Sequence, residues 1–177
     1  MRYIIRTLFS LILLIIIAST LLPNHYKVTK TVTSHCSQAQ IEHWVFDLAN
    51  WHLWTPWATY EREWQQLELV NSNKVGAYLK WQSAKTIGEM TVTQRTEDSL
   101  SYTSLIGQHT NSGTIKTKSF ADIIEVTWTI EGGINAFLVA GLLTYHHKQK
   151  MNDAINLGLR NLNSLCKANQ QGMSYDS

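Results

Sequence analysis

Histidine is the residue type in this sequence best suited to acid–base chemistry near neutral pH. The chain has seven, scattered along its length: His25, His35, His43, His52, His109, His146 and His147. The last two are adjacent, so on a helix their side chains would point about 100° apart and would not share one site. If one group acts as an acid or base, His52 or His109 is the candidate. A lone histidine is more often structural or exposed, so we predict no catalytic residue.

Other catalytic patterns are weak or missing in the sequence. No G-x-S-x-G segment marks a serine nucleophile. Glu61 and Glu63 are better suited to a solvated strand edge than to an acid–base pair. Two cysteines, Cys36 and Cys166, lie 130 positions apart, and no C-x-x-C spacing indicates a metal. They could pair in an exported domain, but we favour two separate, mostly buried thiols. We predict no metal and no cofactor.

Composition limits the classes of function. The chain has 177 residues, of which 44% are hydrophobic and 16% are charged, which suits one globular domain with a short appendage. Its formal charge is +2, and two of its basic residues, Arg2 and Arg6, precede or interrupt the amino-terminal apolar run. The remainder is balanced between acidic and basic residues. We therefore exclude nucleic-acid binding, which needs a basic surface.

Residues 4–22 form an apolar run that ends before Pro23. As a helix these 19 residues would span about 28 Å, enough for a hydrocarbon core of roughly 30 Å. We favour an uncleaved membrane anchor over a cleaved signal peptide, because Ala18-Ser19-Thr20 is a poor cleavage site. A buried core helix is the remaining alternative. Arg2 and Arg6 would keep the amino terminus cytoplasmic and place the domain on the periplasmic or extracellular side, although Lys27 and Lys30 weaken this signal.

A helical segment follows a first strand predicted at residues 26–34. Ser37 and Gln40 fit a capping box, and the next apolar residues recur at helical spacing: Ile41, Trp44, Val45 and Leu48. Asn50 is expected to stop this helix and to cap a short second one through Trp51 and Trp54. Pro56 is expected to end that second helix.

Period-two patterns from residue 60 to 131 predict an antiparallel meander. The expected strands are residues 67–70, 77–82, 87–94, 100–106, 114–120 and 123–131, with turns between them that include residues 108–113. Gly132-Gly133 is expected to break the sheet. Residues 136–143 are apolar nearly all round, so they are either buried or lie against something apolar, such as a membrane. Helical spacing resumes at Tyr145 and aligns Met151, Ile155, Leu159, Leu162 and Cys166.

Several segments then resemble one protein superfamily. Residues 48–57, Leu-Ala-Asn-Trp-His-Leu-Trp-Thr-Pro-Trp, resemble the "D-x-x-x-W-x-x-W-x-P-W" segment of bacterial SRPBCC proteins of the START and polyketide cyclase/dehydrase type. Segments 75–81, 87–92, 125–132 and 156–162 resemble further motifs of that superfamily. The resemblance implies an α+β helix-grip fold, a curved antiparallel sheet of six or seven strands around a long carboxy-terminal helix. The expected units are a transmembrane anchor at 1–23, the domain at 24–168 and a flexible tail at 169–177.

The same resemblance implies an apolar cavity between the sheet and the terminal helix. Its expected wall residues are Trp81, Met90, Val92, Tyr102, Ile115, Trp128, Leu159 and Leu162, all types that a filled core would also use. Trp51 and Trp54 could form a lid or a membrane-interface belt, but we favour plain packing under the terminal helix; for Trp57 the question is open.

The function that we predict is binding or carrying of a hydrophobic small molecule, such as a lipid or isoprenoid, by a membrane-tethered domain. Two alternatives come from the same superfamily. A cyclase- or hydrolase-type enzyme would need a titratable group deep in the cavity. A protein-interaction module would need an exposed apolar patch.

Overall fold

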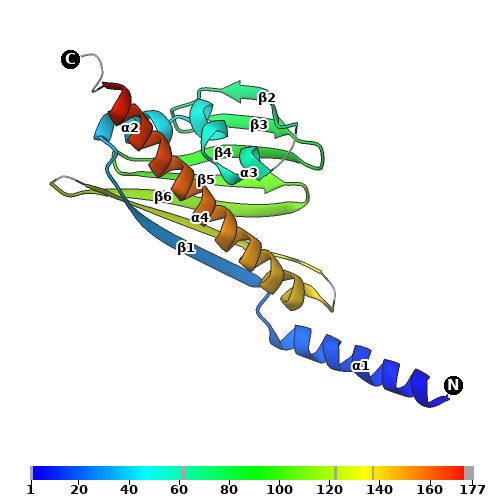
Figure 1. Cartoon of the computed structure of the whole chain (residues 1–177). Coiled ribbons are helices and arrows are strands. Elements are labelled where there is room, and N and C mark those ends of the chain that lie inside the picture. The colour runs from blue at the N-terminus through cyan, green and yellow to red at the C-terminus, as the bar shows by residue number, and fades with distance from the viewer. Residues whose placement is uncertain (1, 61–62, 122, 137, 174–177) are drawn as a thin grey trace.

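A seven-stranded antiparallel sheet forms the body of the protein, with strands in the order β1-β7-β6-β5-β4-β3-β2 (Figure 1). The computed structural model describes residues 2–60, 63–121, 123–136 and 138–173. The strands are β1 (His25–Ser34), β2 (Gln65–Val70), β3 (Tyr78–Gln82), β4 (Ile87–Arg95), β5 (Ser99–Ile106), β6 (His109–Ser119) and β7 (Ile124–Gly133). Strands β2 to β7 follow one another as a meander, and β1 pairs with β7 at the edge. The predicted sheet is confirmed.

Strand β6 begins earlier than the sequence pattern predicts. We expected a turn at residues 108–113, whereas Ile106 pairs with His109 across a turn of Gly107 and Gln108. Gly107 has a φ of +62°, which glycine adopts without strain. The first half of β6 is polar, so it lacks the hydrophobic alternation of a strand. Contrary to our expectation, Gly132 and Gly133 do not break the sheet. They pair with Tyr26 and His25 at the end of β7.

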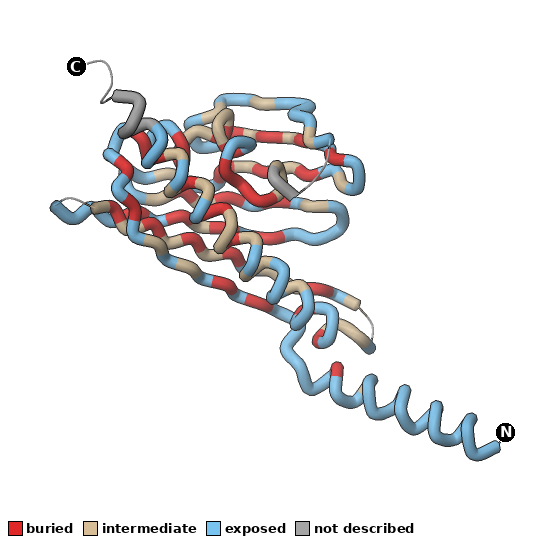
Figure 2. The backbone as a smooth tube through the Cα atoms, in the orientation of Figure 1, coloured by how far each residue is buried: buried red, intermediate tan, exposed pale blue. Residues whose placement is uncertain are grey.

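A long helix, α4 (Ala140–Met173), lies across one face of the sheet (Figure 1). Ile155, Leu159, Leu162 and Cys166 are buried against the sheet, and Figure 2 shows the buried positions concentrated between these two layers. The helix begins five residues before the predicted Tyr145, and its backbone continues through the residues that we expected to begin a tail at 169. Sheet and helix together form the predicted α+β helix-grip arrangement.

Three short helices form a corner between β1 and β2: α2 (Gln38–Trp44), the 3-10 helix η1 (Leu48–Leu53) and α3 (Pro56–Tyr60). The predicted capping box is present: the Ser37 hydroxyl accepts from the Gln40 N–H at 3.2 Å, and the Gln40 Oε1 accepts from the Ser37 N–H at 2.8 Å. The single helix predicted through Leu48 is wrong, because Asp47 caps a separate helix there. Pro56 begins α3, a position where its missing N–H is not needed.

A disulfide joins Cys36, just before α2, to Cys166 on α4. Both cysteines are buried, and the two Cα atoms lie 5.1 Å apart. Our expectation of two separate thiols is therefore wrong. Spacing along the chain carried no information about this pair, because the fold brings together positions 130 residues apart.

The apolar run forms one helix, α1 (Arg2–Leu21), which projects from the end of the domain where β1 begins (Figure 1). It is the one described helix that is long and apolar enough to cross a membrane, and nearly all of it is exposed. These properties fit a membrane span or a signal sequence. The predicted alternative of a buried core helix is wrong.

Candidate functional site

The interior between the sheet and α4 holds every residue that we predicted for the cavity wall. Alternate side chains on the inner face of the sheet point towards α4, because successive residues of a strand face opposite sides. None of the predicted residues is more than 3% exposed. They comprise Trp81, Met90, Val92, Tyr102, Ile115 and Trp128 on the strands, and Leu159 and Leu162 on α4. All eight residues are therefore buried in the core, and their role as the wall of a ligand cavity stays a prediction.

Aromatic rings from the helical corner meet aromatic rings from the sheet in this interior. Trp51 on η1 packs edge-on against Tyr102, with ring centroids 5.3 Å apart. Trp54 packs against Trp128 at 5.2 Å. Both corner tryptophans are fully buried, which confirms the predicted packing role. Such edge-to-face pairs stabilise a core beyond their buried area.

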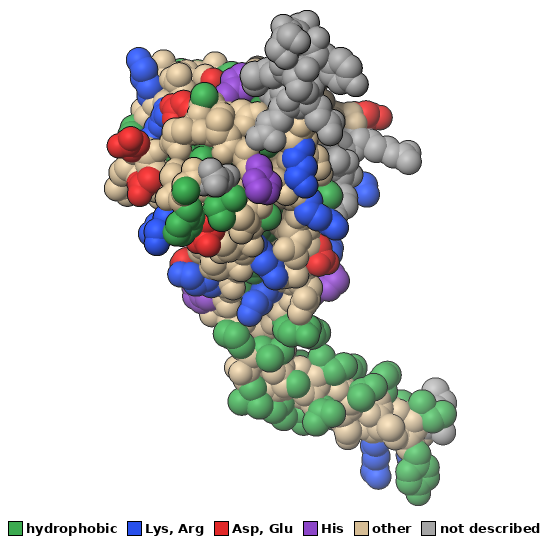
Figure 3. All heavy atoms as spheres, turned by 60° about the vertical axis from the view of Figure 1, so that its left-hand side comes forward, with side chains coloured by type: hydrophobic (Ala, Val, Ile, Leu, Met, Phe, Trp, Pro, Cys, Tyr) green, Lys and Arg blue, Asp and Glu red, His purple; other side chains and the backbone are tan. Residues whose placement is uncertain are grey.

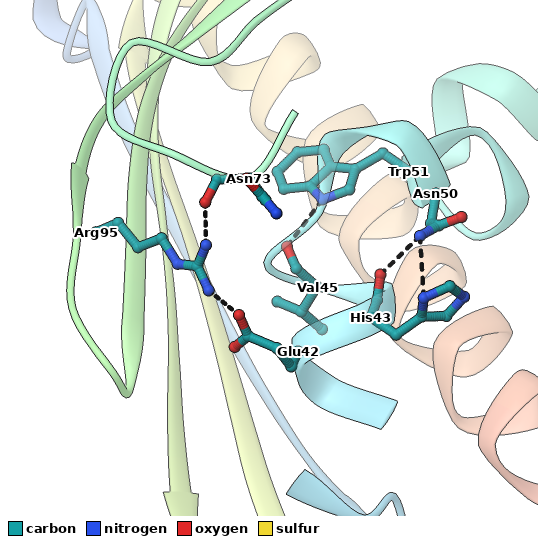
Figure 4. Close-up of polar contacts among 7 residues, drawn as sticks. All are labelled: Glu42, His43, Val45, Asn50, Trp51, Asn73 and Arg95. Atoms are coloured by element: carbon teal, nitrogen blue, oxygen red, sulfur yellow. Dashed lines mark hydrogen bonds and ion pairs between the residues drawn. The ribbon is translucent and has the colours of Figure 1, made fainter. Parts of the chain in front are cut away.

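Hydrogen bonds fix three of these rings. The Trp51 Nε1 donates to the Val45 carbonyl at 2.9 Å, as Figure 4 shows, and the Trp54 Nε1 donates to the Trp44 carbonyl at 2.8 Å. The Trp128 Nε1 donates to the Tyr102 hydroxyl at 2.9 Å. Burial raises the pKa of Tyr102, so its hydroxyl stays protonated and neutral. The hydroxyl can therefore accept from Trp128 and still offer its own proton to another group.

Trp81 differs from these rings, because its Nε1 is buried without a hydrogen-bond partner in the described part of the chain. Its ring lies directly over Gly88, where a Cβ would come within 2.2 Å of the indole. A buried donor that makes no hydrogen bond costs about 1–3 kcal/mol. An oxygen atom in this interior that accepted from Trp81 would remove that cost.

Trp57, on the five-residue helix α3, covers the two sheet tryptophans. Its ring stacks on Trp81 at 6.2 Å and lies edge-on to Trp128 at 5.7 Å. It is only partly buried, unlike Trp51 and Trp54. Gly158 on α4 permits the close approach of α3, because a Cβ there would meet Pro56 at 3.1 Å. Trp57 is thus the ring between the aromatic interior and the outside.

A polar group of residues lies at the end of the interior nearest α1. The Tyr26 hydroxyl donates to the Asn111 Oδ1, and the Tyr26 ring lies 5.2 Å from the ring of His147 on α4. His109 lies 5.5 Å from His147. Burial raises the pKa of Tyr26 to about 12. Burial also lowers the pKa of His147, and His109, Lys150 and His146 lower it further. The His147 Nε2 is buried without a partner among the described residues.

Sequence reasoning missed this polar group. It treated His147 with its neighbour His146, whereas the fold places His147 beside Tyr26 and His109. The two residues named as candidate acids or bases do not meet. His52 is exposed, stacks on Trp64 and has its Nδ1 2.8 Å from the Ala49 carbonyl oxygen. No local pattern could have found the group, because its members come from β1, β6 and α4.

The overall arrangement is similar to several solved structures. A START superfamily protein from Mycobacterium smegmatis matches with a TM-score of 0.61 at 15% identity, over 80% of this chain and 97% of that one. Major latex-like protein 151 from Panax ginseng matches with a TM-score of 0.57 at 14% identity, over 81% and 99%. A Thermus thermophilus protein matches with a TM-score of 0.59 at 15% identity, over 81% and 98%.

The chain has a START-type, SRPBCC-like helix-grip fold. No protein-family model matches the sequence, and the comparison with curated proteins finds no match. At these identities the likeness to solved structures shows the fold, and one fold serves many functions.

The surface of this START-type domain has a charged groove of about 800 Å³ beside the helical corner. Arg95 on β4 donates there to Glu42 on α2 and to the Asn73 carbonyl (Figure 4). Its guanidinium lies 5.4 Å above the Phe46 ring. Asn50 donates to the His43 carbonyl at 2.9 Å, so it closes the end of α2 instead of capping the next helix. The contacts of Arg95 hold the helical corner on the sheet, which gives the groove a structural explanation.

Proposed function

We propose that the protein is a membrane-tethered START-type domain that binds an apolar small molecule between its sheet and α4. The unpartnered Nε1 of Trp81 carries this proposal. Three indole N–H groups are buried without a hydrogen-bond partner among the described residues, and that of Trp81 is the one on a predicted wall residue, where a ligand oxygen could accept from it. The ligand would be an apolar molecule with an acceptor oxygen, of lipid or isoprenoid type.

The rings around Trp81 support this choice of ligand. The predicted wall residues supply the apolar contact, and the Tyr102 hydroxyl is a second donor that remains neutral. Aromatic rings fill the space between them, so a ligand would enter by displacing a ring. Trp57 is the ring that would move, because it is partly exposed and lies on a helix of a single turn.

The buried polar residues favour binding over catalysis. Within the described part of the chain they are Ser, Thr, Gln and Asn residues, which form hydrogen bonds without titrating near neutral pH. An enzyme of the cyclase or hydrolase type would place an acid or base among the wall residues. The titratable His147 lies instead at the end of the interior, beside Tyr26.

The proposed tether is α1, with the domain on the periplasmic or extracellular side. The disulfide supports this location, because disulfides persist in oxidising compartments and are rare in the cytosol. Arg2 and Arg6 at the amino terminus support it as well. A tether would hold the binding site beside a pool of membrane-dissolved molecules and raise their effective concentration.

The test uses the full chain purified in mild detergent. Apolar molecules that copurify are extracted and identified by mass spectrometry. Fatty acids, isoprenoid alcohols and hydrocarbons of equal length are then titrated against tryptophan fluorescence. Trp81→Phe should weaken binding of the oxygen-bearing probes by about two- to tenfold, the value of one hydrogen bond, and leave hydrocarbon binding unchanged.

Trp44→Phe is the matched control. The Trp44 Nε1 is also buried and has no hydrogen-bond partner among the described residues, but Trp44 lies on α2 and outside the predicted wall. Binding by this variant should equal that of the unmodified protein. The proposal is wrong if no apolar molecule copurifies and no probe binds. If Trp81→Phe and Trp44→Phe bind the oxygen-bearing probes equally well, Trp81 does not donate a hydrogen bond to the ligand.

A further inference from the structure

The lower end of the domain, which we call the base, is where α1 meets the folded core. It comprises the start of β1, the β5–β6 turn, the end of β7 and the first turns of α4. The strand pairing places these segments at one end of the sheet, because His25 pairs with Gly133 and Asn111 pairs with Gly132. Because α1 joins the domain at the base, a membrane that α1 crosses would lie beside the base (Figure 1).

The end of α1 is packed on the start of α4 and is not a free linker. A Cβ on Gly141 would come within 2.2 Å of the Ser19 carbonyl oxygen, so only glycine permits this approach. The Leu142 N–H donates to the Ser19 hydroxyl at 3.3 Å, and the Thr144 hydroxyl donates to the Asn24 carbonyl at 3.2 Å. These contacts fix the first turns of α4 at the point where α1 ends.

The first turns of α4 and the segment before them carry exposed apolar side chains. Leu138, Leu142, Leu143 and Tyr145 are all exposed. The domain exposes other large apolar side chains, but these four are close together in the sequence and follow one another beside the end of α1. Apolar groups of this size are favoured in the boundary layer of a bilayer, and a tyrosine at that boundary keeps its hydroxyl in the headgroup region. Because the end of α1 lies against the start of α4, a bilayer around α1 would lie beside this apolar patch.

Two lysines follow the apolar patch along α4, at a distance close to the thickness of the lipid headgroup layer. Lys148 lies six residues beyond Leu142, about 9 Å along a helix, and Lys150 follows. The layer of headgroups on each side of a bilayer is about 5–8 Å thick, and lysine side chains bend readily towards it. Neither lysine forms an ion pair with a described residue. Figure 3 shows basic and histidine side chains on the part of the domain next to the apolar helix.

We propose that the base docks on the bilayer that holds α1. In this arrangement Leu138, Leu142 and Leu143 enter the interface, and Lys148 and Lys150 contact lipid phosphates. The end of the interior that contains Tyr26, Asn111 and His147 then lies closest to the membrane. The inference rests on the proposed tethering by α1, and it specifies how the domain is oriented on that membrane.

The test places one environment-sensitive fluorophore on the full chain in nanodiscs of phosphatidylcholine and phosphatidylglycerol. Both native cysteines are in the buried disulfide, so an added cysteine is the single labelling site. Leu142→Cys and Leu143→Cys report on the base. Leu67→Cys on β2, at the opposite edge of the sheet, is the matched control, because Leu67 is 46% exposed and Leu142 is 47% exposed. Leu14→Cys reports on α1.

Docking predicts that lipid-borne quenchers reduce the emission of labels at 142 and 143, and that aqueous iodide reduces the emission of the label at 67. Lys148→Glu combined with Lys150→Glu should reduce the lipid quenching at 142, whereas Lys116→Glu combined with Lys118→Glu on the outer face of β6 should not. Docking is overturned if iodide quenches the labels at positions 142 and 143 as strongly as the label at position 67, while lipid-borne quenchers reduce the emission of the label at position 14. If Leu14 itself escapes lipid quenching, the tether of the proposed function has failed.

Discussion

The two ends of α4 are attached to the rest of the protein in different ways. Its carboxy-terminal half is held by the Cys36–Cys166 disulfide, and hydrogen bonds from Gln40 to the Cys166 carbonyl and from Ser34 to Asn163 reinforce it. Its amino-terminal half is held by one hydrogen bond to Ser19 in α1, by another to Asn24 between α1 and β1, and by ring contacts of His147. A covalent bond attaches the carboxy-terminal end of α4, whereas hydrogen bonds near the proposed membrane surface attach its amino-terminal end.

This difference separates two tasks. The disulfide end is fixed independently of its surroundings, so it can hold the helical corner and its tryptophans against the sheet. The base contains the imidazole of His147, whose Nε2 has no hydrogen-bond partner among the described residues, and an exposed apolar patch, so its stability depends on pH and on what lies next to it. Substitutions at the two ends should therefore have effects of different size and different dependence on conditions.

The largest expected effect is at the disulfide end. Replacing Cys36 and Cys166 together by alanine should lower the free energy of unfolding by about 2–5 kcal/mol, because a long closed loop is released in the unfolded chain. Urea denaturation of the full chain in detergent, followed by far-ultraviolet circular dichroism, measures this loss. Reductant should have no further effect on the double variant. An unchanged urea midpoint would show that the disulfide does not secure this end.

The same comparison explains what the sequence could predict. The sheet was predictable because its strands bury alternate residues, as β7 does from Ile124 to Ile130. The start of α4 was not, because Leu142 and Leu143 are apolar yet exposed, which hides the helical periodicity. The start of β6 was hidden for the opposite reason. Asn111 and Gly113 face inwards there, beneath the rings of Tyr26 and Tyr102, where a pattern search expects apolar residues.

The candidate site divides in the same way. Its apolar wall was predictable, because each wall residue is a large apolar type on a recognisable strand or helix. The disulfide and the Tyr26–Asn111–His147 group were not, because each joins segments far apart in the chain, and only the completed fold makes them neighbours. The unpartnered Trp81 Nε1 was equally hidden, since residue type does not reveal whether a donor finds an acceptor.

An intermediate effect is expected at Tyr26 in the base. Tyr26→Phe removes the hydroxyl that donates to Asn111 and leaves the buried Oδ1 without this donor. The free energy of unfolding should fall by about 1–3 kcal/mol. Tyr145→Phe is the control, because Tyr145 is exposed. Equal urea midpoints for the two variants would contradict a structural role for the Tyr26–Asn111 hydrogen bond.

The smallest expected effect is the pH dependence contributed by His147. Burial, with help from His109, Lys150 and His146, holds the pKa of His147 below its ordinary value of 6.5. As the pH falls below about 6.5, the unfolded chain takes up this proton more readily than the folded chain, so the folded state loses stability. Above that pH both states carry the neutral imidazole, and His147 contributes no pH dependence.

His147→Gln should remove this contribution. The difference in free energy of unfolding between the variant and the unmodified protein should change as the pH falls from 7 towards 5, in favour of the variant. His52→Gln, at an exposed histidine on η1, is the control for exchanging a histidine for a glutamine. Nanodiscs provide the sharper version of the measurement, because docking of the base would hold His147 near the bilayer surface. A difference that is constant with pH in both settings would show that protonation of His147 does not act on the base.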